Sequence, residues 1–219
     1  MKNLYIVGNW KENKTKEEAS SFLFDFLKNY RARSNVKVVI CPPFLLVPLV
    51  SAFTRSNNLP IDVGVQDISK FEEGAHTGEV SAREAAGFVS HAIIGHSERR
   101  SLGETDDDVQ KKVEMALKNN IEPIVCVTNE NIPIPIGAKI IAYEPVEAIG
   151  TGSPDTPENA ERVASAIKSK NSFVQYVLYG GSVTLENVRK FTEMDHLDGV
   201  LIGGASLDAN SFSSIIKKC

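Results

Sequence analysis

The chain has 219 residues, a formal net charge of −4 and 42% hydrophobic residues. The length and the hydrophobic content suit one domain over residues 1–219 with a substantial core. The sequence has no long basic run, which argues against a nucleic-acid partner. No stretch approaches the roughly 18 apolar residues of a membrane span, and the first apolar run is too short for a signal peptide, so we expect a cytoplasmic protein with no membrane partner.

Short apolar runs alternate with amphipathic segments along the chain. Most of the runs are continuous in Val, Ile and Leu, a pattern typical of parallel strands that are covered on both faces. We expect strands at residues 4–8, 36–41, 61–66, 91–95, 122–127, 139–143, 173–180 and 198–204.

The segments between the runs carry helix signals. Thr156 is a good N-cap and Pro157 a good first helical residue, and an apolar stripe follows them. The apolar helix faces that we expect are Phe22, Leu23, Phe26, Leu27 and Tyr30; Val109, Val113, Ala116 and Leu117; and Ala160, Val163, Ala164 and Ile167.

The fifth unit differs from the others, because only eleven residues, 128–138, separate its strand from the next one. Pro133 and Pro135 forbid a regular helix in this interval, so we expect the helix to be missing or reduced to a turn. The exposed flank would then be covered by Ile132, Ile134 and Ile136 or by another subunit.

Eight strand–helix units without a linker predict an α/β fold, a closed (β/α)8 (TIM) barrel of eight parallel strands. The alternative is an open doubly wound sheet. Such a sheet normally carries a glycine fingerprint after its first strand, and the sequence "GNWKEN" at that place lacks one.

Polar residues end several of the runs. Active sites of (β/α)8 barrels lie at the carboxyl ends of the strands, so the side chains that follow the runs are candidates. Asn9 and Lys11 follow the first run, His96 and Glu98 the fourth, and Glu144 the sixth. A solvated lysine and a packed core histidine are the plain alternatives, but a glutamate is costly to bury without a role.

Charges cluster after the fourth run, in "HSERR". Glu98 could pair with Lys11 across the barrel mouth, and Arg99 could pair with Glu104.

Glycine-rich turns follow the seventh and eighth runs, "GGS" at 180–182 and "GGAS" at 203–206. Such turns let the backbone approach a phosphate closely, although ordinary turns have the same composition. Their paired placement favours a phosphate site, which recurs after the last two strands of these barrels.

The three cysteines are odd in number and fit no zinc spacing, so we expect reduced thiols and no bound metal. Cys41 and Cys126 close apolar runs and should be buried, whereas the terminal Cys219 should be exposed.

Six motifs, "GNWKEN", "GAHTGEVS", "IIGHSERR", "AYEPVEAIGTG", "LYGGSV" and "LIGGASL", resemble the triosephosphate isomerase family in order and spacing over nearly the whole chain. The resemblance implies a cytoplasmic enzyme of glycolysis and gluconeogenesis. It would interconvert dihydroxyacetone phosphate and D-glyceraldehyde 3-phosphate without a cofactor or metal.

The same resemblance implies residue roles. Glu144 would be the base, His96 a neutral imidazole that polarises the carbonyl, and Lys11 and Asn9 would stabilise the enediolate. Glu98 would orient Lys11. The phosphate would be held by main-chain amides of Gly150, Ser182, Gly203 and Gly204.

The resemblance also implies a lid over residues 145–155, which would close on the phosphate and exclude water. Glu147 stands where the family usually has tryptophan. This replacement and the shortened fifth unit are similar to the archaeal branch.

The segment 66–79 resembles the loop through which subunits of this family interdigitate. The chain is therefore expected to form a homodimer, with Thr77 reaching toward Lys11 of the partner subunit, and a tetramer is also possible. His76 replaces a usual aromatic residue, which leads to the hypothesis that its protonation weakens the dimer.

Two other functions remain as alternatives. A different phosphate-binding barrel, such as an aldolase or an epimerase, would need a Schiff-base lysine at a strand centre or clustered His and Asp ligands, and we find neither. A catalytically silent phosphate-binding barrel that acts as a scaffold would have lost Glu144, His96 or Lys11, and all three are present.

Overall fold

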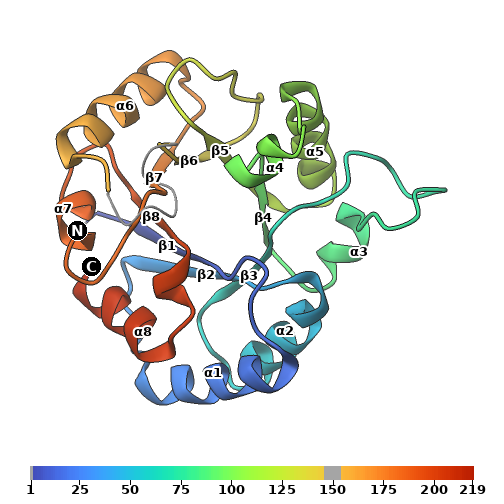
Figure 1. Ribbon diagram of the computed structural model, residues 1–219, viewed down its shortest axis with the longest axis vertical. Helices are drawn as coiled ribbons and strands as arrows, with labels where there is room; N and C mark the ends of the chain where they lie inside the picture. Colours follow the sequence, from blue (N-terminus) through green and yellow to red (C-terminus); the bar gives the residue numbers. More distant parts are fainter. Residues whose placement is uncertain (1, 146–153) are drawn as a thin grey trace.

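The computed structural model describes residues 2–145 and 154–219, and within these residues eight parallel strands close into a barrel ringed by helices (Figure 1). Each strand pairs with the next along the chain, and β8 pairs with β1 to close the ring. The predicted (β/α)8 barrel is therefore confirmed. The strands are β1 (Leu4–Asn9), β2 (Val36–Cys41), β3 (Asp62–Val65), β4 (His91–Ile94), β5 (Glu122–Val127), β6 (Ile140–Tyr143), β7 (Tyr176–Tyr179) and β8 (Gly199–Ile202).

Capping side chains fix where several helices begin. Thr156 accepts a hydrogen bond from the backbone N–H of Asn159 (3.2 Å), and Pro157 is the first helical residue, as the sequence predicts. Thr15, Ser81 and Thr105 form capping boxes at three other helices. The helices are α1 (Lys16–Asn29), α2 (Val47–Ser56), α3 (Ala82–Ala86), α4 (Ser97–Ser101), α5 (Asp106–Lys118), α6 (Pro157–Lys170), α7 (Val188–Thr192) and α8 (Ala209–Lys218), with 3-10 turns at η1 (Phe44–Leu46) and η3 (Gly204–Ser206).

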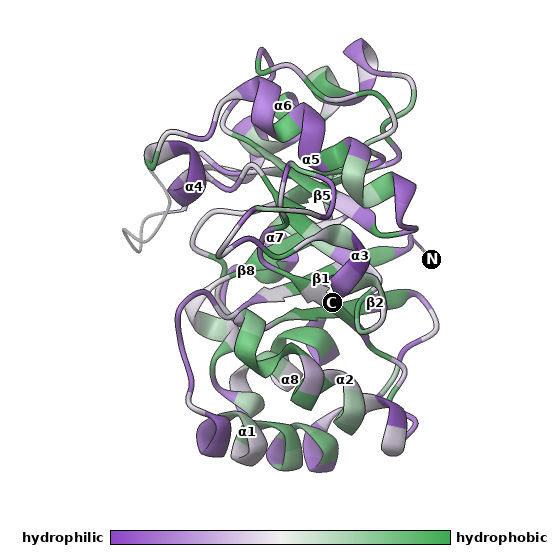
Figure 2. Cartoon of the chain, turned by 90° about the vertical axis from the view of Figure 1, so that its right-hand side faces the viewer, coloured by the Kyte–Doolittle hydropathy of each residue, from purple (hydrophilic) through white to green (hydrophobic). Residues whose placement is uncertain are grey.

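Apolar side chains fill both faces of the sheet. One cluster, which includes Val7, Ile93 and Leu178, fills the barrel interior, and a larger one lies between the strands and the helices. Figure 2 shows the strands as largely hydrophobic and the hydrophilic residues as lying mainly on the helices and loops. The predicted helix faces are buried except at two positions, since Leu27 is half-buried and Leu117 is 38% exposed.

The fifth unit has no helix. Residues 128–139, all of which the structure describes, form turns and bends between β5 and β6 (Figure 1). Ile132 and Ile134 pack against the core, whereas Ile136 is 81% exposed. The expectation of a missing helix is thus confirmed, and the prediction that all three isoleucines cover the flank holds for two of them.

Cys41 and Cys126 are buried as expected, but Cys219 is not freely exposed, because it packs partly against the core at the end of α8. The amphipathic last helix places it there. In the described residues, no helix combines the length and apolar character that crossing a membrane requires.

Candidate active site

Seven of the nine predicted site residues line one cavity of about 130 Å³ at the carboxyl ends of the strands. Of the other two, Glu98 contacts this group through Lys11, and Gly150 lies outside the described residues. The fold therefore brings together residues that are distant in sequence. The seven are Asn9, Lys11, His96, Glu144, Ser182, Gly203 and Gly204.

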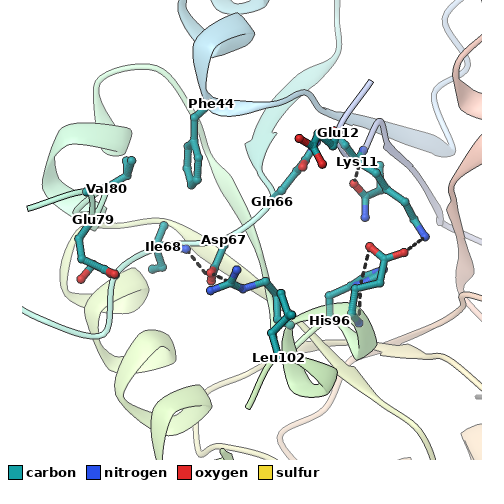
Figure 3. A pocket seen from close by; sticks show the side chains of 15 residues that line it. Lys11, Glu12, Phe44, Gln66, Asp67, Ile68, Glu79, Val80, His96 and Leu102 are labelled. Carbon is teal, nitrogen blue, oxygen red and sulfur yellow. Dashed lines mark hydrogen bonds and ion pairs between the residues drawn. The ribbon is translucent and has the colours of Figure 1, made fainter. Parts of the chain in front are cut away.

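Lys11 is held in an unusual backbone conformation immediately after β1. Its φ angle is 51°, in the left-handed region, and its backbone N–H donates to Oδ1 of Asn9 at 3.0 Å. Its Nζ pairs with Oε1 of Glu98 at 2.5 Å, which confirms the predicted pair. Figure 3 shows the Lys11 side chain reaching toward the segment that carries His96.

Gln66 supports this arrangement, although the sequence predicts it only as the last residue of the third strand and the first of the dimer loop. Its side-chain amide donates to the carbonyl oxygens of Lys11 and Cys41, each at 2.9 Å. It thereby ties the segment after β3 to the ends of β1 and β2. Its position directly after the third strand was the signal that could have identified it.

His96 is 5% exposed and caps the short helix α4. Its Nδ1 accepts a hydrogen bond from the backbone N–H of Glu98 (3.2 Å), which places the proton of the neutral imidazole on Nε2. The Nε2 atom lies 3.0 Å from Oε1 of Glu144. The imidazole can therefore donate from Nε2 into the cavity.

Two effects oppose each other in setting the pKa of His96. Burial disfavours the charged imidazolium, but the hydrogen bond and the negative charge of Glu144 outweigh it, and the charge of Glu98 adds to them. The pKa of His96 is consequently raised above its usual value.

Glu144 is 2% exposed, and both of its carboxylate oxygens are hydrogen-bonded. Oε1 contacts His96, and Oε2 accepts from the backbone N–H of Ser97 at 3.1 Å. Gly180 lies against the same side chain, since a Cβ at this glycine would stand 2.9 Å from Cγ of Glu144. The carboxylate thus sits in a dry, closely packed place that suits a base.

The glycine turns after β7 and β8 form the opposite wall of the cavity. Ser182 has a φ angle of 43°, and its carbonyl accepts from Asn187 at 3.0 Å. A Cβ at Gly204 would meet nothing within 4 Å, so a ligand can approach this backbone closely. Ser206 fixes the turn by donating to the carbonyl of Gly203 at 2.7 Å.

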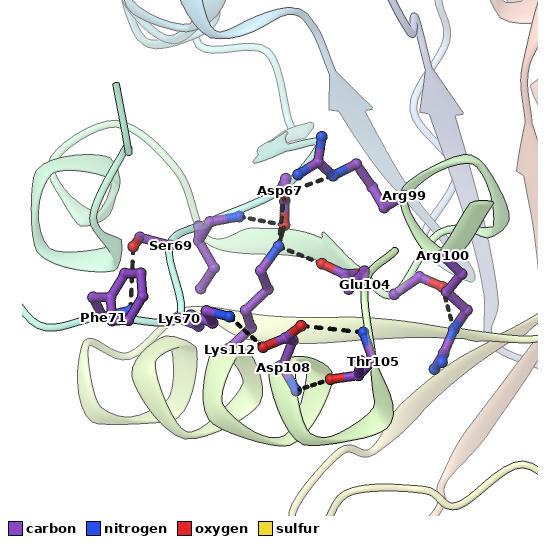
Figure 4. A network of polar contacts seen from close by, with 12 residues as sticks. Asp67, Ser69, Lys70, Phe71, Arg99, Arg100, Glu104, Thr105, Asp108 and Lys112 are labelled. Atoms are coloured by element: carbon purple, nitrogen blue, oxygen red, sulfur yellow. Dashed lines mark hydrogen bonds and ion pairs between the residues drawn. The ribbon is translucent and has the colours of Figure 1, made fainter. Parts of the chain in front are cut away.

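One predicted ion pair is wrong. Arg99 pairs with Asp67 at 3.1 Å, and Glu104 instead pairs with Lys112 (Figure 4). Lys112 is 5% exposed and also bonds Asp67 at 2.6 Å. A buried ammonium requires carboxylate partners, which explains why Glu104 turns toward α5 rather than toward Arg99.

A second cavity, of about 390 Å³, adjoins the first and shares Asn9, Lys11 and His96 with it (Figure 3). Its walls also carry the exposed side chains of Phe44 and Leu102. Among the described residues, no three His, Cys, Asp or Glu side chains gather as a metal-binding group.

Comparisons with known proteins point to one family. The model of the Triosephosphate isomerase family matches residues 4–133 and 135–219. Triosephosphate isomerases of Mesomycoplasma hyorhinis and Endomicrobium trichonymphae are each 37% identical, over 99% of this chain and 98% and 99% of their own lengths. That of Solibacter usitatus is 38% identical over 99% of both chains.

The relatives also carry segments that this chain lacks, because an alignment of 251 positions covers 99% of its 219 residues. The break in the family match, at residue 134, falls in the connection that has no helix.

Proposed function

The chain belongs to the triosephosphate isomerase family, and from this premise we propose how the residues of the cavity divide the reaction among them. The chain interconverts dihydroxyacetone phosphate and D-glyceraldehyde 3-phosphate. The observation that carries the proposal is the contact between Glu144 and His96 at 3.0 Å inside a cavity that Lys11 also lines.

Glu144 is proposed as the base that removes a proton from the carbon next to the carbonyl and returns it to the neighbouring carbon. The carboxylate must first break its contact with His96. In the free enzyme this contact uses both the Nε2 donor of His96 and the Oε1 acceptor of Glu144. A substrate carbonyl oxygen can then take the Nε2–H of His96, while the freed carboxylate faces the carbon acid.

His96 would act as a neutral imidazole that polarises the carbonyl and moves protons between the two oxygens. The bond from the Glu98 N–H to Nδ1 supports this role, because it occupies the lone pair that a second proton would need. A neutral histidine electrophile paired with a glutamate base is the established pattern of this family, and the contact between His96 and Glu144 agrees with it.

Lys11 is proposed to stabilise the negative charge that develops on the enediolate, and Asn9 to donate a hydrogen bond at the same oxygen. Glu98 would orient Lys11 through the ion pair at 2.5 Å. Because Lys11 and His96 supply this stabilisation, we propose that the reaction requires neither a metal nor a cofactor.

The phosphate group is proposed to lie against the glycine turns, held by the main-chain N–H groups of Ser182, Gly203 and Gly204. The open space at Gly204 supports this placement. Gly150 would complete the phosphate site. It belongs to the proposed lid at 145–155, of which residues 146–153 lie outside the described residues.

A homodimer formed through residues 66–79 is proposed as the active assembly. Residues 71–79 are all exposed, and within them the rings of Phe71 and His76 stack at 4.2 Å. The cavity of about 390 Å³ beside Lys11 offers a groove for this loop of a second copy, with Leu102 79% exposed at its wall. A tetramer would need a further surface, such as the helix-free flank at Ile136.

We also propose that residues 1–219 form one domain that acts in the cytoplasm. The pairing of β1 with β8 supports a single domain, because segments from both ends of the chain close the same barrel.

Isomerisation of glyceraldehyde 3-phosphate in a coupled assay with EDTA tests the proposal. We expect high activity from the wild-type protein and a loss of about 10²- to 10⁴-fold in Glu144→Gln, which keeps the shape but removes the base. Persistent activity in folded Glu144→Gln would refute the assignment of the base. An inactive but folded wild-type protein would favour the scaffold alternative.

A further inference from the structure

Lys14 links two loops that are far apart in the sequence. Its Nζ donates to the carbonyl oxygen of Leu207 at 2.6 Å, across 193 residues of the chain. Lys14 lies between β1 and α1, three residues after Lys11, and Leu207 caps η3 at its carboxyl end. Residues 203–207, which include the proposed phosphate-binding Gly203 and Gly204, are called the phosphate turn below. The bond therefore joins the loop of Lys11 to the phosphate turn.

The backbone of Lys14 has a conformation that favours glycine. Its φ angle is 78°, in the left-handed region, and Lys11 lies in the same region with a φ angle of 51°. A lysine adopts this conformation only at an energetic cost, and such a residue persists where its surroundings hold it in place. The contacts of the Lys14 side chain must therefore offset the strain of its backbone.

Two buried aromatic rings form a platform for the Lys14 ammonium. Its Nζ lies 5.3 Å from the centre of the Trp10 ring and 4.9 Å from that of Phe22, which are distances of cation–π attraction. The two rings meet edge to face with their centres 4.8 Å apart. Burial lowers the pKa of Lys14, against the charges of Glu18 and Asp208. The ammonium thus lies in a partly dry place, where the Leu207 carbonyl replaces contacts with water.

The phosphate turn is compact and lies against Lys11. The backbone N–H of Leu207 donates to the carbonyl of Gly204 at 3.1 Å, and that of Ser206 donates to the carbonyl of Gly203 at 2.9 Å. A Cβ at Gly203 would stand 3.5 Å from Cε of Lys11. Fixing Leu207 therefore fixes the rest of the turn, and a shift of the turn would change its position relative to Lys11.

We propose that Lys14 is a positioning residue for the phosphate turn, holding its main-chain N–H groups in register with Lys11 through the hydrogen bond to Leu207. The proposal rests on the proposed phosphate site at this turn. Lys14 lies outside the residues that line the cavity, so it acts on the substrate only through the turn.

Lys14→Met and Lys14→Arg test this role by steady-state kinetics with glyceraldehyde 3-phosphate, and by inhibition with inorganic phosphate. Methionine keeps an apolar stem over the two rings but has no donor for the Leu207 carbonyl. We expect KM and the inhibition constant of inorganic phosphate to rise about tenfold in Lys14→Met, because a small displacement of binding groups is costly. The value of kcat should fall less than about threefold, since Glu144 and His96 follow other strands.

Lys14→Arg should restore both constants to within about threefold of the wild-type values, because arginine can stack on the aromatic rings and donate to the carbonyl. Unchanged KM and inhibition constant in Lys14→Met would overturn the proposal. A change confined to kcat would overturn it as well, because the phosphate turn would then not be the group that Lys14 positions.

Lys2→Met is the matched control. Lys2 donates to the carbonyl of Met194 at 2.6 Å, across 192 residues of the chain, but it lies before the amino end of β1. The substitution thus removes the same kind of bond at the end of the barrel away from the cavity. We expect a lower melting temperature with unchanged KM and inhibition constant. Increases as large as those of Lys14→Met would show general loosening and overturn the proposal.

The wild-type protein separates failure of this proposal from failure of the proposed phosphate site. If inorganic phosphate does not compete with the substrate in the wild-type protein, the phosphate site fails and the positioning role fails with it. If it competes equally well in the wild-type protein and in Lys14→Met, only the positioning role is overturned. Lys14→Gly keeps the test valid if Lys14→Met does not fold, because glycine adopts a φ angle of 78° without strain and lacks the ammonium.

Discussion

The pair formed by His96 and Glu144 determines which protonation state of the free enzyme can bind substrate productively. The proposed mechanism needs an ionised Glu144 and a neutral His96. A single added proton, wherever it resides in this pair, removes either the base or the neutral imidazole. Because Glu144 raises the pKa of His96, we expect this proton to be gained at a pH above the ordinary value for histidine.

The pH profile of kcat/KM tests this reasoning. We expect kcat/KM to fall with a slope of about one as the pH decreases through a pKa above about 6.5, the ordinary value for histidine. Below this pKa the pair of His96 and Glu144 carries the added proton, so activity is present above the pKa and lost below it. A profile that stays flat down to pH 6, measured with substrate ionisation taken into account, would contradict the expectation.

Sequence reasoning predicted that Asn9, Lys11, His96 and Glu144 meet at one cavity, because strand ends in a barrel converge on one mouth. It did not find the direct contact between His96 and Glu144, since that contact depends on how β4 and β6 are placed around the ring. It paired Arg99 wrongly for a related reason. The true partner, Asp67, follows a different strand. The separation of Arg99 and Asp67 along the chain does not indicate how close they lie in the barrel.

At the scale of elements, the strands were predictable and their register was not. Continuous apolar runs identify buried parallel strands, and the prolines of 128–138 exclude a helix. The run at 173–180 was predicted too long, because the ladder between β7 and β6 starts only at Tyr176. Parallel pairing joins residues across a whole helical unit, so no short-range pattern in the sequence specifies it.

The amino ends of β3 and β4 carry a polar group centred on His91. His91 is 2% exposed, with Nδ1 at 2.9 Å from the hydroxyl of Ser90 and 3.5 Å from Oδ2 of Asp62. Its Nε2 has no hydrogen-bond partner among the described residues. Lys37 pairs with the same Asp62 at 3.1 Å and thereby places a positive charge nearby.

This environment should make the fold sensitive to acid. Burial lowers the pKa of His91 to about 4, with Lys37 acting in the same direction and Asp62 against it. The pKa of His91 is lower in the folded than in the unfolded chain. Below about pH 6.5 the unfolded chain therefore takes up a proton that the folded chain does not. The stability of the fold is full above this pH and is lost progressively as the pH falls toward 4. With these two pKa values, the expected loss of stability at pH 5 is about 2 kcal/mol.

Urea unfolding of the wild-type protein and His91→Gln, at pH 7.5 and pH 5 and one protein concentration, measures this effect. We expect the difference in unfolding free energy between the two proteins to change by about 2 kcal/mol, with the wild type losing more stability at pH 5. An equal loss in both proteins would show that other groups control the acid sensitivity.

At the scale of the whole molecule, Leu102 and Ile136 are two of several strongly exposed apolar residues in the described part of the chain, and each marks a candidate surface for self-association. Leu102 stands 79% exposed beside the cavity that adjoins Lys11, and Ile136 stands 81% exposed on the flank without a helix. Leu102 lines the cavity that adjoins the proposed active site, whereas Ile136 lines neither of the two cavities. Association through the first would therefore affect activity, whereas association through the second would not.

Leu102→Asp and Ile136→Asp form a matched pair, because each places a carboxylate at an equally exposed leucine-sized position and should cost the monomer little. We expect Leu102→Asp to raise the dimer dissociation constant by at least about tenfold, since a buried, unpaired charge in an interface costs well over 1.4 kcal/mol. Its specific activity should fall on dilution, as Lys11 loses the neighbouring loop of the partner subunit. Sedimentation velocity and activity over a dilution series measure both effects. If Ile136→Asp dissociates the protein and Leu102→Asp does not, the helix-free flank is the interface, and the proposal that residues 66–79 join the subunits is wrong.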